Sequence, residues 1–257
     1  MATLLKANEV TKIYAKGQRP SLNKVSFNVA ESEFIAIMGA SGSGKTTLLN
    51  VLSTIDTPTS GSIVINGVNL KQLSDTGAAD FRRDNLGFIF QEYFLLDSLT
   101  IRENISVPLT LQKLPYKKIE KMVRSLAERF GIASQLDKYP NELSGGQRQR
   151  ASAARAIVKQ PSILFADEPT GALDSNSATE LLKTLKEANE ELHTTILMVT
   201  HDAYLSLIHI YRYSGLITGE NKSAHIPIPK GIRTMGEHIC LTQFAKPNER
   251  HAGHNNR

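Results

Sequence analysis

The sequence predicts an α/β fold built around a parallel sheet. Three continuous apolar runs, at residues 34–38, 162–166 and 195–199, are typical of strands that are buried on both faces. Helical patterns separate these runs, and buried strands that alternate with helices indicate a parallel sheet. An alternating pattern at 25–29 and a tight-turn Asn-Gly pair indicate half-buried strands nearer the N-terminus.

Two of the helical patterns have recognisable ends. Apolar residues in 117–131 follow a spacing of 3.6 residues, and Gly131 is placed to terminate that helix. Ser177 and Glu180 form a capping-box pattern at the start of a second helix. Residues from about 92 to 160 contain no buried-strand pattern, so we expect a helical insertion into the α/β core.

Composition and charge indicate a soluble globular chain without a nucleic-acid partner. The 257 residues are 40% apolar and 21% charged, and the single cysteine excludes an internal disulfide. No run approaches the roughly 18 apolar residues of a membrane span. Residues 205–257 hold seven Lys/Arg against three Asp/Glu, and therefore four of the five net positive charges. Because residues 1–204 are nearly neutral, a basic face for nucleic acid is not expected.

The stretch GASGSGKT, residues 39–46, matches the phosphate-binding loop (P-loop) pattern G-x-x-x-x-G-K-[ST] at every fixed position. It follows a buried strand and opens a helical pattern, a context that separates a P-loop from a solvated Gly/Ser turn. Lys45 would reach the β and γ oxygens of a nucleotide, and the Thr46 hydroxyl would ligate Mg²⁺. The predicted nucleotide-binding residues are Gly39, Ala40, Ser41, Gly42, Ser43, Gly44, Lys45, Thr46 and Thr47.

Two carboxylates end the apolar run in ILFADE, residues 163–168, where parallel sheets meet their ligands. Asp167 would hold the Mg²⁺ shell, and Glu168 would polarise an attacking water. An acidic strand-to-loop transition without function is the alternative, which the P-loop disfavours. Tyr14 could stack its ring on adenine, or could equally be a surface or core tyrosine.

Further motifs complete a family resemblance. From Tyr14 and the P-loop the chain continues through GFIFQ (Gln91), LSGGQ (143–147), ILFADE, GALD (Asp174) and VTHD (His201). In this order, over about residues 3–203, the motifs resemble those of the ATP-binding-cassette (ABC) ATPases. The resemblance implies a P-loop NTPase fold with a RecA-like parallel-sheet core, an N-terminal antiparallel β subdomain and an inserted helical subdomain. It also implies ATP and Mg²⁺ as ligands and ATP hydrolysis as the activity.

The resemblance also assigns roles within the site. Glu168 would act on the attacking water, and Gln91 would touch that water or Mg²⁺. His201 would hydrogen-bond the γ-phosphate and orient Glu168. Asp174 would lie across a dimer interface near the opposite P-loop. The implied catalytic residues are thus Glu168, His201 and Gln91, and the implied metal ligands are Thr46, Gln91 and Asp167.

LSGGQ precedes an Ala/Arg-rich helical pattern, where two consecutive glycines let the backbone approach a neighbour closely. Ser144 lies near the N-cap, and its hydroxyl, the amides of Gly145 and Gly146 and the helix dipole would form a second anion site. In the ABC family this segment, with Gln147, closes over ATP bound by a partner subunit, which gives a head-to-tail homodimer. A helix cap at a domain surface is the alternative interpretation.

A single cassette without membrane spans resembles the ATP-binding subunit of a transporter whose permease is a separate chain. Three stretches closely resemble the bacterial antimicrobial-peptide (bacitracin-type) export and resistance ATPases, relatives of the lipoprotein-release, macrolide-export and cell-division cassettes: GFIFQEYFLLDSLTIRENISVPLTL, KYPNELSGGQRQRASAARAI and FADEPTGALDS. The resemblance implies a peripheral location at the cytoplasmic face of the cell membrane. In the family the residues after Gln91 dock the permease, here Tyr93, Phe94, Leu95 and Leu96. They could instead fill the helical core, and we expect about half to be exposed.

The family pattern breaks after VTHDAY. We therefore expect an ATPase domain at 1–204 and an atypical tail at 205–257, which carries five of the seven histidines and no recognisable strand pair. LSLIHI, at 205–210, is what a common transposon-derived sequencing adapter would encode, so the tail is either chimeric or frame-shifted, or a divergent natural segment. Because the strand before His201 would lose neighbours, nucleotide binding is expected to be more robust than turnover. A competent motor subunit and a hydrolysis-impaired cassette both stay open.

Overall fold

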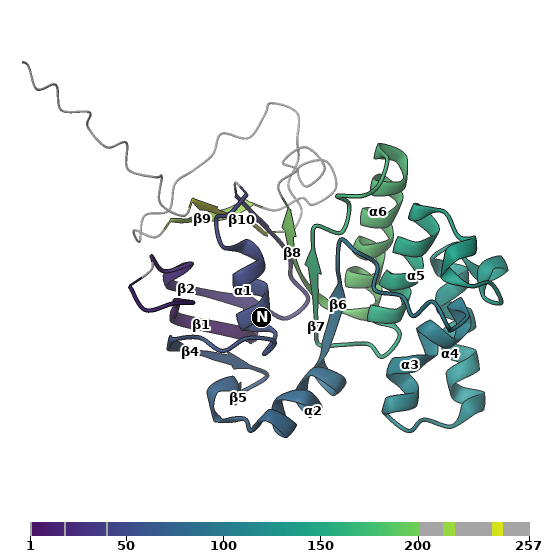
Figure 1. Cartoon of the computed structure of the whole chain (residues 1–257), viewed down its shortest axis with the longest axis horizontal. Helices are drawn as coiled ribbons and strands as arrows, with labels where there is room; N and C mark the ends of the chain where they lie inside the picture. The colour runs from purple at the N-terminus through teal and green to yellow at the C-terminus, as the bar shows by residue number, and fades with distance from the viewer. Residues whose placement is uncertain (1, 18, 40, 201–212, 219–237, 244–257) are drawn as a thin grey trace, which may run out of the picture.

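The apolar runs of the sequence form the centre of a six-stranded parallel sheet (Figure 1). The computed structural model describes residues 2–17, 19–39 and 41–200, together with the backbone of residues 213–218 and 238–243. The strand order is β6-β7-β8-β3-β10-β9. Four of these strands are β3 (Phe34–Met38), β6 (Leu86–Ile89), β7 (Ile163–Asp167) and β8 (Thr195–Thr200). Every residue of β3 and β8 is buried, as the continuous apolar runs predict.

A second, antiparallel sheet is formed by the N-terminal part of the chain. Its order is β2-β1-β4-β5, with the strands β1 (Thr3–Lys12), β2 (Leu22–Ala30), β4 (Ser60–Ile65) and β5 (Val68–Asn69). Asn66 and Gly67 join β4 to β5 with φ angles of 51° and 75°, so the predicted tight turn is confirmed. This sheet packs with α1 (Lys45–Leu52) and with Ile35 and Ile37 of β3 in one hydrophobic cluster.

The opposite face of β3, with Phe34 and Ala36, belongs to a second cluster that most of the helices cover. Between β6 and β7, where the structure describes every residue, the chain forms helices and no strand. These helices are α3 (Ile101–Leu111), α4 (Tyr116–Arg129) and α5 (Gly145–Ile157), with short 3₁₀ turns at Ala133–Gln135 and Pro140–Glu142. The other helical segments are the 3₁₀ turn Leu70–Gln72, α2 (Asp75–Asn85) and α6 (Ser175–Leu192). The predicted α/β fold, with its antiparallel sheet and helical subdomain, is confirmed.

One predicted helix end is confirmed and one predicted start is wrong. α4 ends where the pattern predicts, because Gly131 follows its C-cap with a φ of 62°. α6 begins earlier than the Ser177 and Glu180 pattern predicts. Its N-cap is Asp174, whose carboxylate accepts the backbone N–H groups of Asn176 and Ser177 at 3.1 and 3.0 Å. An ionised carboxylate is a strong cap, which accounts for the earlier start.

Two expectations that concern the C-terminal tail are also wrong. One was that the tail has no recognisable strand pair, and the other was that the strand before His201 would lose neighbours because of the tail. The tail contains β9 (Tyr213–Thr218) and β10 (His238–Gln243), although the sequence shows no recognisable strand pair there. β10 pairs in parallel with β3, and β9 with β10. β8 lies between β7 and β3, so both of its neighbours precede the tail. The strand that borders the tail is β3, which leads into the P-loop.

Candidate nucleotide-binding site

The P-loop connects the end of β3 to the start of α1. Lys45 is the first residue of α1, and its side chain folds back so that Nζ donates to the carbonyl oxygen of Gly39 at 2.8 Å. Gly44 precedes it with a φ of 93°, and a Cβ there would lie 2.4 Å from the backbone oxygen of Ser21. Glycine is therefore required at position 44 both by conformation and by space.

The remaining P-loop residues fit an anion. Ser41 and Gly42 are exposed, whereas the Ser43 hydroxyl is buried and has no hydrogen-bond partner in the described part of the chain. A buried hydroxyl without a partner is unfavourable, and a phosphate oxygen would satisfy it. The amides of the first turn of α1 point in the direction that anions occupy at helix N-termini. Ala40, also a predicted binding residue, lies outside the described residues.

Thr46 and Asp167 face each other where α1 meets the end of β7. The Thr46 hydroxyl donates to Asp167 Oδ1 at 3.4 Å. Burial raises the pKa of Asp167, and the Thr46 hydrogen bond opposes that shift. A hydroxyl and a carboxylate suit Mg²⁺. The described residues contain no group of three or more His, Cys, Asp or Glu that could hold a metal. An ion here would therefore need phosphate and water oxygens as well.

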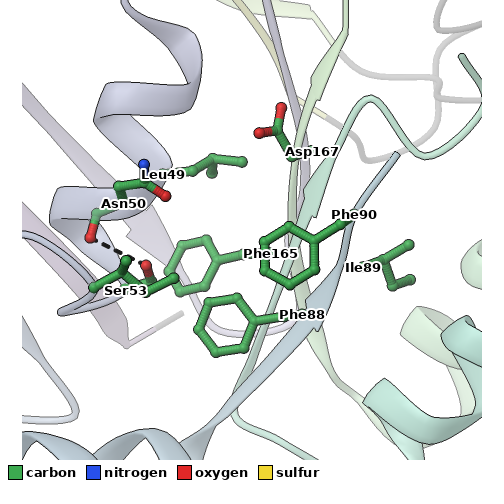
Figure 2. Close-up of a pocket in the computed structure, with 9 residues that line it drawn as sticks. Leu49, Asn50, Ser53, Phe88, Ile89, Phe90, Phe165 and Asp167 are labelled. Atoms are coloured by element: carbon green, nitrogen blue, oxygen red, sulfur yellow. Dashed lines mark hydrogen bonds between the residues drawn. The ribbon is translucent and has the colours of Figure 1, made fainter. Parts of the chain in front are cut away.

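A small pocket with aromatic side chains in its lining lies beneath Asp167. The pocket lies between α1 and strands β6 and β7 (Figure 2). Figure 2 shows the rings of Phe88, Phe90 and Phe165 gathered below the Asp167 carboxylate. Phe88 stacks on Phe90 with ring centroids 5.8 Å apart, and Phe90 meets Phe94 edge-on at 5.1 Å. These apolar rings disfavour the ionised carboxylate.

Glu168 occupies a strained turn just beyond β7. Its φ is 46°, which is uncommon for a residue with a side chain and is often found at functional sites. The turn is held by hydrogen bonds from Glu168 N–H to the Val199 carbonyl at 2.9 Å and from Gly171 N–H to the Glu168 carbonyl at 3.0 Å. Gln91 lies against this turn, because a Cβ on Gly171 would be 3.2 Å from Gln91 Nε2. The structure therefore brings Gln91 and the Glu168 turn together.

Tyr14 stands on the surface beside the start of α1. The residue is 57% exposed, which excludes the alternative of a core tyrosine. The Tyr14 hydroxyl is 3.5 Å from Thr47 Oγ1, and the Lys12 ammonium lies 4.9 Å from the ring centroid. The ring is thus close to the P-loop helix and accessible, as a base-stacking residue must be.

LSGGQ forms the start of α5, and Ser144 is its N-cap as predicted. The Ser144 hydroxyl accepts the Gln147 N–H at 3.3 Å, and Gln147 Oε1 accepts the Ser144 N–H at 3.0 Å. A Cβ on Gly145 would lie 3.0 Å from the Tyr93 hydroxyl, and a Cβ on Gly146 would lie 3.0 Å from Ser177 Oγ. The two glycines therefore lie against neighbours in their own chain. Figure 1 shows α5 and α1 on opposite sides of β6 and β7.

Asp174 lies beside this segment through α6. Its Oδ2 accepts the Ser177 hydroxyl at 2.7 Å. Hydrogen bonds from the backbone N–H and then from the hydroxyl of Ser177 lower the pKa of Asp174. The start of α6 and the start of α5 thus form one cluster at the surface. His201, expected to complete the catalytic residues, lies outside the described residues.

The four residues of the family's permease-docking segment, Tyr93 to Leu96, divide as expected. Phe94 and Leu96 are 59% and 49% exposed, whereas Tyr93 and Leu95 are partly buried. α5 holds this loop: Ser152 Oγ donates to the Tyr93 carbonyl at 2.9 Å, and Arg155 donates to the carbonyls of Phe94 and Tyr93 at 2.6 and 3.1 Å. Neither Ser152 nor Arg155 is among the site residues that the sequence predicts.

Asn104 of α3 also shapes this loop without having been predicted to do so. It is fully buried, accepts the Leu96 N–H at 2.7 Å, and donates to the carbonyls of Leu96, Leu99 and Thr100 at 3.0 Å each. A polar residue inside an apolar helical pattern was the only available signal for Asn104, and also for Ser152.

The ABC transporter family model matches residues 22–171, which is more than half of the chain. The chain belongs to the ABC transporter family. Its ABC ATPase domain is 53% identical to the bacitracin export ATP-binding protein BceA of Halalkalibacterium halodurans, over 77% of this chain and 79% of that protein. It is 43% identical to the macrolide export ATP-binding/permease protein MacB of Vibrio parahaemolyticus, over 77% of this chain and 31% of that protein.

The chain also has the same fold as solved ABC cassettes. A dimeric post-hydrolysis state of the cassette MJ0796 bound to ADP and Pi matches with a TM-score of 0.73 and 36% identity, over 80% of this chain and 91% of that chain. As a member of this family, the chain is an ATP-binding ATPase. Among the helices that the structure describes, none is both long and apolar enough to cross a membrane.

Proposed function

We propose that this ABC ATPase drives a separate membrane permease that confers resistance to antimicrobial peptides of the bacitracin type, by export or by protection. The observation that carries the proposal is the 53% identity to BceA. The chain would then work at the cytoplasmic face of the cell membrane, with no nucleic-acid partner.

Within the site, the P-loop residues and Tyr14 would hold ATP. Thr46, Asp167 and Gln91 would hold Mg²⁺, which supplies positive charge to the phosphate oxygens when bound. Glu168 would accept a proton from the attacking water, with His201 beside it. The support for this assignment is the 3.4 Å contact between Thr46 and Asp167 and the closeness of Gln91 to the Glu168 turn.

The second half of each ATP site would come from a partner copy. Ser144, Gly145, Gly146 and Gln147 would meet the phosphates of ATP that the partner binds, with Asp174 near the partner's P-loop. The dimeric cassette structures that the chain resembles support this arrangement. The permease would dock on the loop that exposes Phe94 and Leu96.

Glu168→Gln tests the ATPase site and the homodimer together. Without the carboxylate, turnover is expected to fall about 100-fold or more, because general-base catalysis contributes roughly that factor. With ATP and Mg²⁺, the variant should elute from a sizing column as a dimer. A variant that binds ATP tightly and stays a monomer would contradict the homodimer.

Growth in the presence of antibiotics tests the substrate class. Expression together with its permease should raise the bacitracin concentration that a sensitive host tolerates, and the Glu168→Gln variant should not. Protection against macrolides alone would instead favour the MacB-like alternative, which the 43% identity supports. Protection against neither would leave the lipoprotein-release and cell-division alternatives.

For the domain organisation, we propose an ATPase domain at 1–204 and an atypical tail at 205–257 that is foreign to it, either chimeric or frame-shifted. In support, the matches to BceA and to the ABC transporter ATP-binding protein YxdL of Bacillus subtilis span only 201 and 204 residues of this chain. A foreign tail leaves the hydrolysis-impaired cassette as the alternative function. Sequencing the gene from its source decides the origin of the tail, and an identical tail in native DNA would refute the chimera.

A further inference from the structure

Gln149 lies on the buried face of α5, shortly after LSGGQ, and only 1% of it is exposed. Its Nε2 donates to the Phe90 carbonyl at 3.3 Å and to the Pro169 carbonyl at 2.8 Å. Phe90 immediately precedes Gln91, and Pro169 immediately follows Glu168. A single side-chain amide therefore joins the backbone segments that carry two of the proposed hydrolytic residues.

The chemistry of this contact requires an amide. Both partners are carbonyl oxygens, so only the Gln149 nitrogen, with its two N–H groups, can face them. Gln149 Oε1 is buried and has no hydrogen-bond partner among the residues that the structure describes. A buried acceptor without a partner is unfavourable, so packing stability alone does not account for an amide at this position.

We propose that Gln149 is a positioning residue for ATP hydrolysis, which holds Gln91 and Glu168 in register with the helix that begins at LSGGQ. Gln91 already lies against the Glu168 turn through Gly171, so a shift of either segment displaces the other. Because α5 is one continuous helix, a movement of its start also moves Gln149. The inference rests on the ATPase activity of the proposed site and not on the peptide substrate.

The chain contains a matched control for this role. Asn189 of α6 is also a buried amide, 5% exposed, and its Nδ2 donates to the carbonyls of Ser32 and Thr194 at 3.0 and 2.7 Å. Ser32 and Thr194 precede β3 and β8, whereas the P-loop and Asp167 lie at the other ends of the strands. Asn189 therefore makes the same kind of bridge at the opposite end of the sheet from the site.

The experiment compares Gln149→Glu with Asn189→Asp in the full chain, without permease. Each change places a carboxylate oxygen against two carbonyl oxygens, so both should lower the melting temperature. For Gln149→Glu, kcat should fall about tenfold or more, because misplacing catalytic groups by about 1 Å can cost up to roughly 100-fold. The Kd for a fluorescent ATP analogue should stay within about twofold of the wild type, since the P-loop is untouched. Asn189→Asp should keep the wild-type kcat.

Gln149→Met provides a second variant of similar volume that removes the donors without adding charge, and its kcat should also fall at unchanged Kd. Wild-type turnover in both Gln149 variants would overturn the inference while leaving the ATPase site intact. Equal losses of kcat in Gln149→Glu and Asn189→Asp would reduce Gln149 to a structural residue. A wild-type chain that binds the analogue without hydrolysing ATP would refute the ATPase site itself, and the inference with it.

Discussion

Helices α1 and α5 both begin at segments proposed to hold ATP phosphates, but their first turns are built differently. α1 follows Gly44, which adopts a left-handed conformation and makes no side-chain cap. α5 follows Ser144, which forms a reciprocal capping box with Gln147. The backbone amides at the start of α1 are therefore left for an external anion. At the start of α5, the N–H groups of Ser144 and Gln147 are hydrogen-bonded within the chain.

This difference separates the two proposed halves of the ATP site. The first turn of α1 is already arranged for phosphate in a single chain, with the Lys45 ammonium and the Ser43 hydroxyl beside it. At the start of α5, the Ser144 hydroxyl accepts the Gln147 N–H, and its own O–H would donate to a nucleotide. We infer that a single chain binds ATP at α1, and that α5 contributes only when a second copy presents its bound ATP.

The largest expected contrast is between Gly44→Ala and Gly146→Ala. An Ala at 44 would place Cβ 2.4 Å from the backbone oxygen of Ser21 at a φ of 93°, so the free energy of unfolding should fall by about 2–3 kcal/mol or more. At 146 the nearest atom is the rotatable Ser177 hydroxyl at 3.0 Å. There the gain in helix propensity, about 0.5–1 kcal/mol, offsets the close contact. Urea unfolding measures both, and equal losses would contradict the contrast.

Ser144→Ala sharpens the comparison, because it removes a cap that is also a proposed ligand. The free energy of unfolding should fall by about 1 kcal/mol, and turnover should fall while ATP binding to a single chain persists. Thr100→Ala is the control, since Thr100 caps α3 in the same kind of box with Glu103. It should lose similar stability and keep its turnover. Wild-type turnover in Ser144→Ala would argue against a nucleotide contact at α5.

The smallest expected effect is in the pH dependence of stability, and its sign differs between Asp167, which faces α1 from the end of β7, and Asp174, which caps α6. Burial raises the folded-state pKa of Asp167 above 3.8, so the native state binds more protons than the unfolded state between the two values. The stability due to Asp167 therefore falls as pH rises through that window. Hydrogen bonds lower the pKa of Asp174, so its contribution is present above 3.8 and is lost as pH falls through the folded value.

Urea unfolding at several pH values, without nucleotide, tests these signs. Relative to the wild type, Asp167→Asn should gain stability as pH rises through its window, because the variant no longer carries the disfavoured charge. Asp174→Asn should instead lose stability relative to the wild type as pH rises. Parallel pH profiles for the two variants would show that their environments do not differ as the structure indicates.

The sequence by itself determined the parts of this protein that depend on neighbouring residues. Continuous apolar runs at 34–38 and 195–199 became fully buried strands, Gly131 ended α4, and Ser144 capped α5. The P-loop pattern marked the strand–loop–helix unit, because the spacing of a few residues sets that geometry. The order of the motifs along the chain also indicates the family by itself.

Only the tertiary structure decided which distant segments meet. The sequence predicted that the strand before His201 would lose neighbours, whereas the sheet places β8 between β7 and β3 and makes β3 the neighbour of the tail. No local pattern indicates that the Gln149 amide reaches the carbonyls of Phe90 and Pro169, which lie 59 and 20 residues away. Sheet order and buried polar contacts depend on the packing of whole elements, and short-range residue patterns carry no record of that packing.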